Sequence, residues 1–126
     1  MSKIKLRKTI FKSSFCHLNK VILCLGEEEF AKCCKKHSLQ EYKIDKDGIT
    51  IRVRKTGKRT ICIIGLKYEG ISAFDLTGIL LHEIVHATDF IMEESDFTDK
   101  EMRAYITHDM YLKSILFIKS TSLVDI

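Results

Sequence analysis

The sequence predicts a small α+β domain. Residues 49–54 and 59–66 are short apolar runs with strand-like patterning on either side of a turn, which indicates a β-hairpin. Residues 72–95 and 98–118 are longer and carry apolar residues at helical spacing. A chain of 126 residues is long enough for one domain with a modest core.

The first third of the chain predicts one strand and one helix. Residues 1–19 show no clear period, so we expect a basic lead-in there. The run KVILCL, residues 20–25, is rich in β-formers and predicts a buried strand that ends at Gly26. Residues 27–37, EEEFAKCCKKH, begin with acids and end with lysines, as the helix dipole favours. The inner stripe of this helix would be Phe30, Cys33 and Cys34.

The remaining boundaries follow from turn and capping signals. A turn at residues 47–48 precedes the strand ITIRVR, whose apolar face would hold Ile49, Ile51 and Val53. Ser72-x-x-Asp75 has the spacing of a capping box, so the following helix is expected to begin at Ser72. After the last helix, residues 119–126 are expected to form a frayed tail.

Charge is distributed unevenly along the chain. Residues 1–60 carry 16 Lys/Arg against 6 Asp/Glu, whereas residues 61–126 carry 5 against 11, which together give the net charge of +4. A basic half is compatible with nucleic-acid contact, but the lysines are dispersed, which favours a solvated surface. The hairpin by itself, with an exposed basic side, accounts for much of the excess.

Cysteine usage and hydropathy indicate a cytoplasmic protein without a membrane segment. The chain has five cysteines and no C-x-x-C pair, a pattern that favours buried free thiols and a reducing compartment. The longest apolar run near the start, residues 21–25, is too short for the core of a signal peptide. No stretch has the length of a membrane span.

The segment ILLHEIVHATDF, residues 79–90, carries the chemistry. On a helix His82 and His86 lie one turn apart on the same face, so both imidazoles can bind one zinc ion about 2 Å away. Glu83 lies beside the pair, where its carboxylate can accept a proton from a water molecule instead of binding the metal. The alternative is a core helix with two hydrogen-bonded histidines. Burying these three polar groups unpaired would cost several kcal/mol, which favours the metal site.

Such a site needs a third ligand. Glu101, at the start of the last helix, can reach over the site after a short turn, and His108 on the same face is the reserve. Asp89 is better placed as a hydrogen-bond partner for an imidazole N–H. Thr98-x-x-Glu101 is also a capping box, in which Glu101 would only bond the backbone of Thr98. Spacing alone leaves the roles of ligand and cap open.

The stretches LLHEIVHATDF and EMRAYITHDMYL together resemble the gluzincin-type metallopeptidases. They are most similar to the small domains of phages and prophages, and distantly to the ImmA/IrrE and SprT-like proteins. The resemblance implies a minimal zincin-like fold over about residues 20–118, in which a small sheet with a hairpin packs on an N-terminal helix, the HExxH helix and a C-terminal helix. It implies zinc ligands His82, His86 and Glu101, the general base Glu83, and Tyr105 as a donor to the developing oxyanion.

Two functions are therefore expected as alternatives. In the first, the chain is a zinc metallopeptidase whose substrate is a polypeptide, with one specific host or phage protein as the narrow case. It would act in the cytoplasm, including that of a host cell whose phage or other mobile element encodes it. An extended substrate would add to the hairpin edge TICIIGL. In the second, the fold is a silent binding module that grips a host protein or nucleic acid through RVRKTGKR. Glu83 favours the enzyme, because a purely structural zinc site has no need of it.

Overall fold

The computed structural model describes residues 7–13, 16–37, 39, 42–44, 46–54, 60–94 and 98–126. They form four strands and three helices in the order β1-β2-α1-β3-β4-α2-α3. The bounds are β1 Lys8–Ser13, β2 Cys16–Leu25, α1 Glu27–Lys36, β3 Gly48–Val53, β4 Ile61–Leu66, α2 Ala73–Glu94 and α3 Lys100–Thr121. The predicted α+β class is confirmed.

The four strands form one mixed sheet in the order β1-β2-β4-β3. β1 pairs antiparallel with β2, β2 pairs parallel with β4, and β3 pairs antiparallel with β4. The predicted hairpin is therefore present, with Ile51 opposite Ile63. Because β4 lies between β2 and β3, the edge strands of the sheet are β1 and β3.

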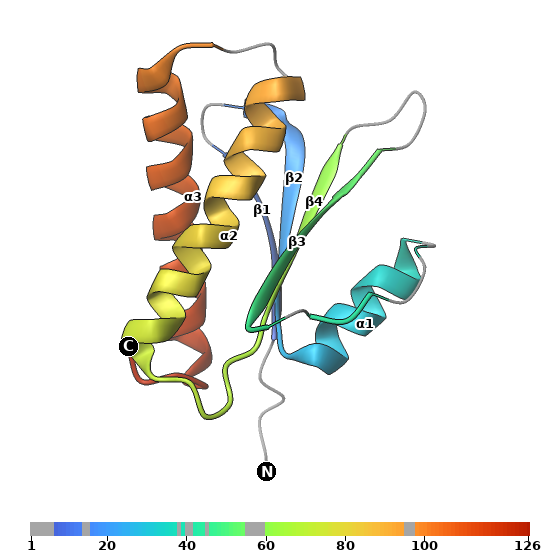
Figure 1. Cartoon of the computed structure of the whole chain (residues 1–126), viewed down its shortest axis with the longest axis vertical. Coiled ribbons are helices and arrows are strands. Elements are labelled where there is room, and N and C mark those ends of the chain that lie inside the picture. Colours follow the sequence, from blue (N-terminus) through green and yellow to red (C-terminus); the bar gives the residue numbers. More distant parts are fainter. Residues whose placement is uncertain are drawn as a thin grey trace.

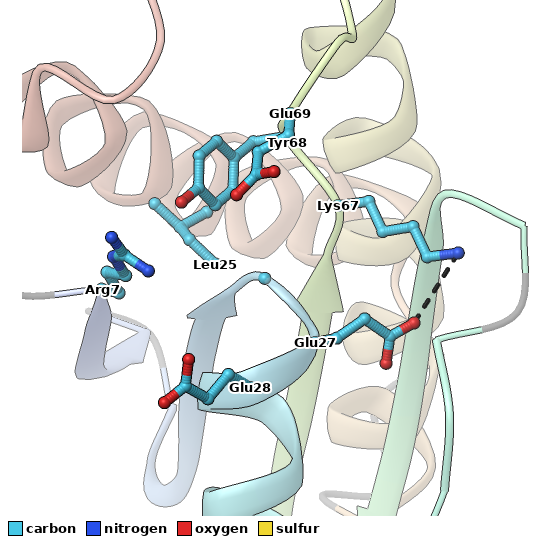
Figure 2. Close-up of a pocket in the computed structure, with 8 residues that line it drawn as sticks. Arg7, Leu25, Glu27, Glu28, Lys67, Tyr68 and Glu69 are labelled. Atoms are coloured by element: carbon cyan, nitrogen blue, oxygen red, sulfur yellow. Dashed lines mark ion pairs between the residues drawn. The ribbon is translucent and has the colours of Figure 1, made fainter.

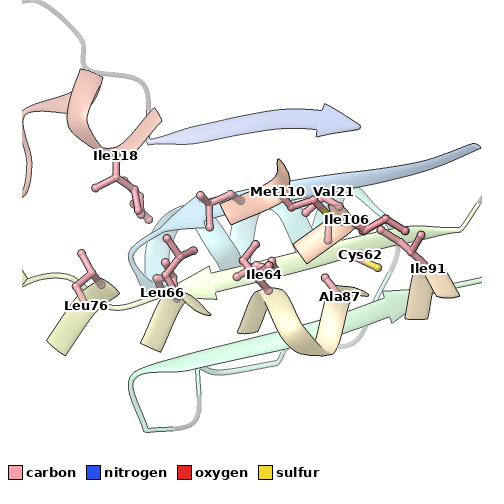
Figure 3. Close-up of a cluster of buried hydrophobic side chains, with 14 of the residues drawn as sticks. Val21, Cys62, Ile64, Leu66, Leu76, Ala87, Ile91, Ile106, Met110 and Ile118 are labelled. Atoms are coloured by element: carbon pink, nitrogen blue, oxygen red, sulfur yellow. The ribbon is translucent and has the colours of Figure 1, made fainter. Parts of the chain in front are cut away.

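Helices cover both faces of this sheet, α1 on one side and the antiparallel pair α2 and α3 on the other (Figure 1). Residues 21–25 of β2 and 62–66 of β4 are buried on both faces, which explains why these two segments are continuous apolar runs. Side chains alternate along β2, so that Val21 and Leu23 face α2 and α3 while Ile22 faces α1. Figure 3 shows the larger core between the sheet and the paired helices, where Ile64 and Leu66 meet Leu76, Ala87 and Met110.

The smaller core confirms the predicted inner stripe of α1. Phe30, Cys33 and Cys34 are buried against the sheet, together with Val53. Ile49 and Ile51 are partly buried and pack against the same cluster, so the predicted apolar face of β3 is also confirmed.

α2 begins as predicted and α3 does not. The Ser72 hydroxyl accepts a hydrogen bond from the Asp75 N–H at 3.1 Å, so Ser72 caps α2. The cap of α3 is Asp99, whose carboxylate accepts the Glu101 N–H at 2.9 Å. The expected capping box with Thr98 is therefore wrong by one residue, because an aspartate next to the threonine supplies the stronger acceptor.

The described parts of both chain ends contain more secondary structure and packing than expected, while residues 1–6 lie outside the described residues. The predicted lead-in, residues 1–19, contains strand β1 and the beginning of β2. The predicted tail, residues 119–126, is not frayed, because α3 continues to Thr121 and both Leu123 and Val124 pack against the larger core. These segments are held by long-range contacts that no local periodicity reveals. One such contact is the hydrogen bond that the Lys113 Nζ donates to the Lys12 carbonyl at 2.6 Å.

Two contacts fix the register of α2 against α3. The Thr107 hydroxyl donates to the Thr88 hydroxyl at 3.0 Å, and Arg103 forms an ion pair with Asp89. In an antiparallel pair with this register, the first turn of α3 is level with the last turn of α2, as Figure 1 shows. This register decides which residues of α3 can approach the histidines of α2.

Candidate metal centre and cleft

The two histidines of the motif lie together on the exposed side of α2. Their Nε2 atoms are 3.2 Å apart, and their rings meet edge to face with centroids 4.8 Å apart. Two nitrogens bound at about 2.0 Å to one tetrahedral ion must lie roughly 3.3 Å apart. The spacing of His82 and His86 fits two ligands of a single zinc ion, and it also fits a hydrogen bond between the two imidazoles.

Glu83, the predicted base, is buried between α2 and the edge strand β3 with 6% of its surface exposed. Its Oε1 accepts a hydrogen bond from the Thr50 hydroxyl at 2.8 Å, and the Thr50 hydroxyl also lies 3.1 Å from the Glu83 carbonyl oxygen. Its Oε2 is directed past Gly48, where an added Cβ would lie 3.1 Å away. The backbone of β3 thus passes close beside this carboxylate.

A cleft with a volume of about 750 Å³ opens between the turn that precedes β3 and the first half of α2. His82 and Glu83 both line it, so a ligand and the predicted base share one cavity. Apolar side chains, three glycines and charged side chains line the remainder. The apolar residues are Ile71, Phe74 and Ile79, the glycines are Gly48, Gly70 and Gly78, and the charged residues are Lys46, Asp47 and Asp75.

The predicted third ligand is not assembled with the pair. Among the residues that the structure describes, no three His, Cys, Asp or Glu side chains are grouped so as to hold a metal ion. Glu101 is exposed in the first turn of α3, two residues before the Arg103 that meets Asp89. It is therefore level with the end of α2 and not with His86.

The other predicted participants on α3 are also exposed. His108 follows Thr107, the partner of Thr88, so along the helix axis it lies closer to His86 than Glu101 does. Tyr105 is 51% exposed. Its role as an oxyanion donor stays a prediction.

Asp89 has a different partner from the one expected. Its carboxylate forms an ion pair with Arg103 of α3. Asp89 thus helps to hold α2 and α3 together. Among the described contacts, none joins Asp89 to an imidazole.

On the basic side of the hairpin, Arg52 packs on α2 and is mostly covered, which corrects the expectation of a solvated side at this position, whereas Arg54 is exposed as expected. Arg52 is 3.3 Å from Glu93 and stacks over Phe90 at 4.7 Å from the ring centroid. Arg54 forms an ion pair with Glu94, and this hydrogen bond lowers the pKa of the Glu94 carboxyl. Two of the five basic residues of RVRKTGKR, Arg52 and Arg54, are therefore ion-paired within the chain, while Lys55, Lys58 and Arg59 lie outside the described residues.

The expected docking edge also changes. The segment TICIIGL contains β4, which is paired on both sides and has no open edge. The two strands with an unpaired side in the sheet are β1 and β3, and of these β3 borders the cleft through Gly48.

A second hollow, of about 350 Å³, lies where β2 meets α1 (Figure 2). Lys67 and Glu27 form an ion pair on one side at 3.6 Å, and Arg7 lies on the opposite side. Its lining contains neither histidine nor cysteine, so it offers no counterpart to the chemistry of α2.

Sequence reasoning missed Thr50 and Gly48. Alternation along β3 placed Thr50 on the face opposite Ile49 and Ile51, and that face was taken to be solvated. The available signal was a polar residue facing an apolar helix, which becomes informative only when both faces of β3 are known to be covered.

Comparisons with protein-family models, curated proteins and solved structures give no match. In the described part of the chain, no helix combines the length and the apolar character needed to cross a membrane. The chemistry of the α2 motif and its cleft therefore carries the functional argument.

Proposed function

We propose that the chain is a zinc-dependent peptidase in which His82 and His86 hold the metal and Glu83 is the general base. The observation that carries this proposal is the 3.2 Å separation of the two Nε2 atoms. This spacing occurs next to a buried carboxylate that lines the same cleft as His82. A hydrogen bond between the two imidazoles would account for the spacing alone, but not for the buried carboxylate beside the pair at the cleft.

A zinc ion bound there would polarise the carbonyl of the scissile bond and lower the pKa of water. Glu83 would accept the proton of the attacking water and then deliver it to the leaving amine. For this task its carboxylate must stay fixed at the edge of the cleft, and the hydrogen bond from Thr50 keeps it there.

The third ligand that we propose is Glu101, with His108 as the reserve. The cap at Asp99 leaves the Glu101 side chain without the capping role that was the main alternative. Its backbone N–H, not its carboxylate, takes part in the cap. His108 has no capping role either and lies closer to His86 along the helix axis, so the preference for Glu101 rests on the resemblance of EMRAYITHDMYL to the gluzincin motif.

The substrate that suits this cleft is an extended polypeptide. β3 is an edge strand, and an unpaired strand edge binds an extended chain through main-chain hydrogen bonds. A peptide added there would lie along the cleft beside His82 and Glu83. We place the activity in a cytoplasm, in line with the buried thiols of Cys24, Cys33, Cys34 and Cys62.

The proposal is tested by incubating the zinc-supplemented protein with a proteome-derived peptide library and identifying new termini by mass spectrometry. Glu83→Gln should abolish these termini, because the amide cannot accept the proton, while the zinc content is retained. Glu93→Gln is the matched control, since it changes a mostly exposed carboxylate on the same helix. New termini that persist in Glu83→Gln, or their absence in the parent protein, would reject the proposed reaction.

A further inference from the structure

We propose that Thr50 is a positioning residue for Glu83 and that Gly48 leaves the space in which the free carboxylate oxygen works. This inference rests on the proposed function, since it gives the two oxygens of the proposed base different tasks. Oε1 is the anchored oxygen, and Oε2 is the one that exchanges the proton.

The anchor is a single short hydrogen bond between two elements. The Thr50 hydroxyl has one proton, and the nearer of its two acceptors is Glu83 Oε1, at 2.8 Å against 3.1 Å for the carbonyl oxygen. A hydrogen bond to an ionised carboxylate is also stronger than one to a neutral carbonyl. The hydroxyl therefore fixes Oε1 to β3 and leaves the remaining oxygen to point elsewhere.

The other oxygen is directed along the glycine. A Cβ added to Gly48 would lie 3.1 Å from both Cγ and Oε2 of Glu83, and 2.9 Å from Cγ2 of Ile79. Gly48 is thus required by close approach, because its backbone has no positive φ that would call for glycine. Gly48 and Glu83 both line the cleft, so Oε2 borders the space where a substrate would lie.

A purely structural carboxylate would be expected to have more partners. Within the described residues, Glu83 has one side-chain donor only, although 94% of the residue is covered. Burying a carboxylate with one donor is unfavourable, and an apolar residue would fill the same interface at lower cost. A half-anchored carboxylate is what proton transfer needs, because one oxygen is held and the other stays available.

The test compares Thr50→Val, which keeps the shape and loses the hydroxyl, with Thr50→Ser, which keeps the hydroxyl. Gly48→Ala perturbs the other oxygen. Thr121→Val is the matched control, because the described hydrogen bonds of the Thr121 hydroxyl, to the Ile118 carbonyl and from the Leu123 N–H, lie at the end of α3 and away from the cleft. Each variant is assayed for kcat and KM on a library peptide that the parent protein cleaves, and for zinc affinity.

Thr50→Val and Gly48→Ala should each lower kcat by roughly 10- to 100-fold, the loss expected when a reacting group is displaced by about 1 Å. KM and zinc affinity should stay the same, and Thr50→Ser should recover most of the rate. Thr121→Val should leave kcat unchanged. If Thr50→Val keeps the parent kcat, or if Thr50→Ser is as slow as Thr50→Val, the positioning role is overturned.

A second measurement tests the hydrogen bond between Thr50 and Glu83 without an activity assay. Urea midpoints are compared for Thr50→Val, Glu83→Met and the double variant. Thr50→Val should lower the midpoint of the parent protein by more than it lowers that of Glu83→Met. Equal shifts would mean that the hydroxyl serves only the backbone carbonyl, which overturns the proposal. A coupled pair in a protein that cleaves nothing would instead reject the peptidase while confirming the contact.

Discussion

The Nε2 atoms of His82 and His86 lie 3.2 Å apart on one exposed side of α2. Two neutral imidazoles at this distance are well placed to share one metal ion. We therefore expect the purified protein to take up about one zinc per chain. His82→Ala and His86→Ala should each remove it, as measured by mass spectrometry of the metal content. His37→Ala, a histidine at the end of α1, is the control that should keep it.

The same measurement of zinc content distinguishes Glu101 from His108 as the third ligand. Glu101→Ala should weaken zinc binding by about 10-fold or more, while His108→Ala should leave it unchanged. The opposite result would exchange the two assignments, and unchanged binding in both variants would remove α3 from the site. Absence of zinc binding in the parent protein would make His82 and His86 ordinary exposed side chains of α2.

Helices whose limits are set by residues within the same segment could be predicted from the sequence. The helix dipole and the apolar stripe placed α1, and the Ser72 cap placed the start of α2. β1 was missed because it carries no alternation of its own and is held by pairing with β2. Periodicity describes a segment, whereas pairing depends on a partner elsewhere in the chain.

The site could be predicted only as far as one helix extends. Spacing along α2 was enough to pair His82 with His86, because helix geometry sets the distance between residues i and i+4. The contact between Thr50 and Glu83 joins residues 33 positions apart, and no pattern within either segment predicts it. The basic hairpin was misread for the same reason, since Glu93 and Glu94, which pair with Arg52, are on a different element.

Gly65 tests the close packing of α1 on the sheet. An added Cβ would lie 2.6 Å from Cδ1 and 2.8 Å from Cγ of Phe30, a fully buried ring that cannot move away freely. Gly65→Ala should therefore lower the free energy of unfolding by about 1–3 kcal/mol, measured by urea denaturation.

Gly78 supplies the control for this substitution, because nothing lies within 4 Å of a Cβ added there. Gly78→Ala, in the middle of α2, should raise the stability by about 0.5–1 kcal/mol. Phe30→Leu should restore part of the loss in the Gly65→Ala background. Equal stability of the two alanine variants would contradict the packing of Phe30 against β4.

Glu94 should make the stability of the protein depend on pH in the acid range. A hydrogen bond from Arg54 is the main cause that lowers the pKa of the Glu94 carboxyl from its ordinary value of 4.5, and the charges of Arg54 and Arg52 act in the same direction. The unfolded chain therefore binds the proton at a higher pH than the folded chain does. The contribution of Glu94 is fully present above pH 4.5 and is lost as the pH falls through the lower folded pKa.

The comparison that measures this contribution is urea unfolding of the parent protein and Glu94→Gln between pH 7 and pH 3. At pH 7 the variant should be less stable by about 0.5–1 kcal/mol, because it loses the charge that pairs with Arg54. The difference should shrink below pH 4.5, since the parent carboxyl becomes neutral as well. Glu28→Gln, which affects only the exposed ion pair with Lys32, should change stability little at any pH. A constant difference across the range would show that the lost stability comes from packing and not from the charge.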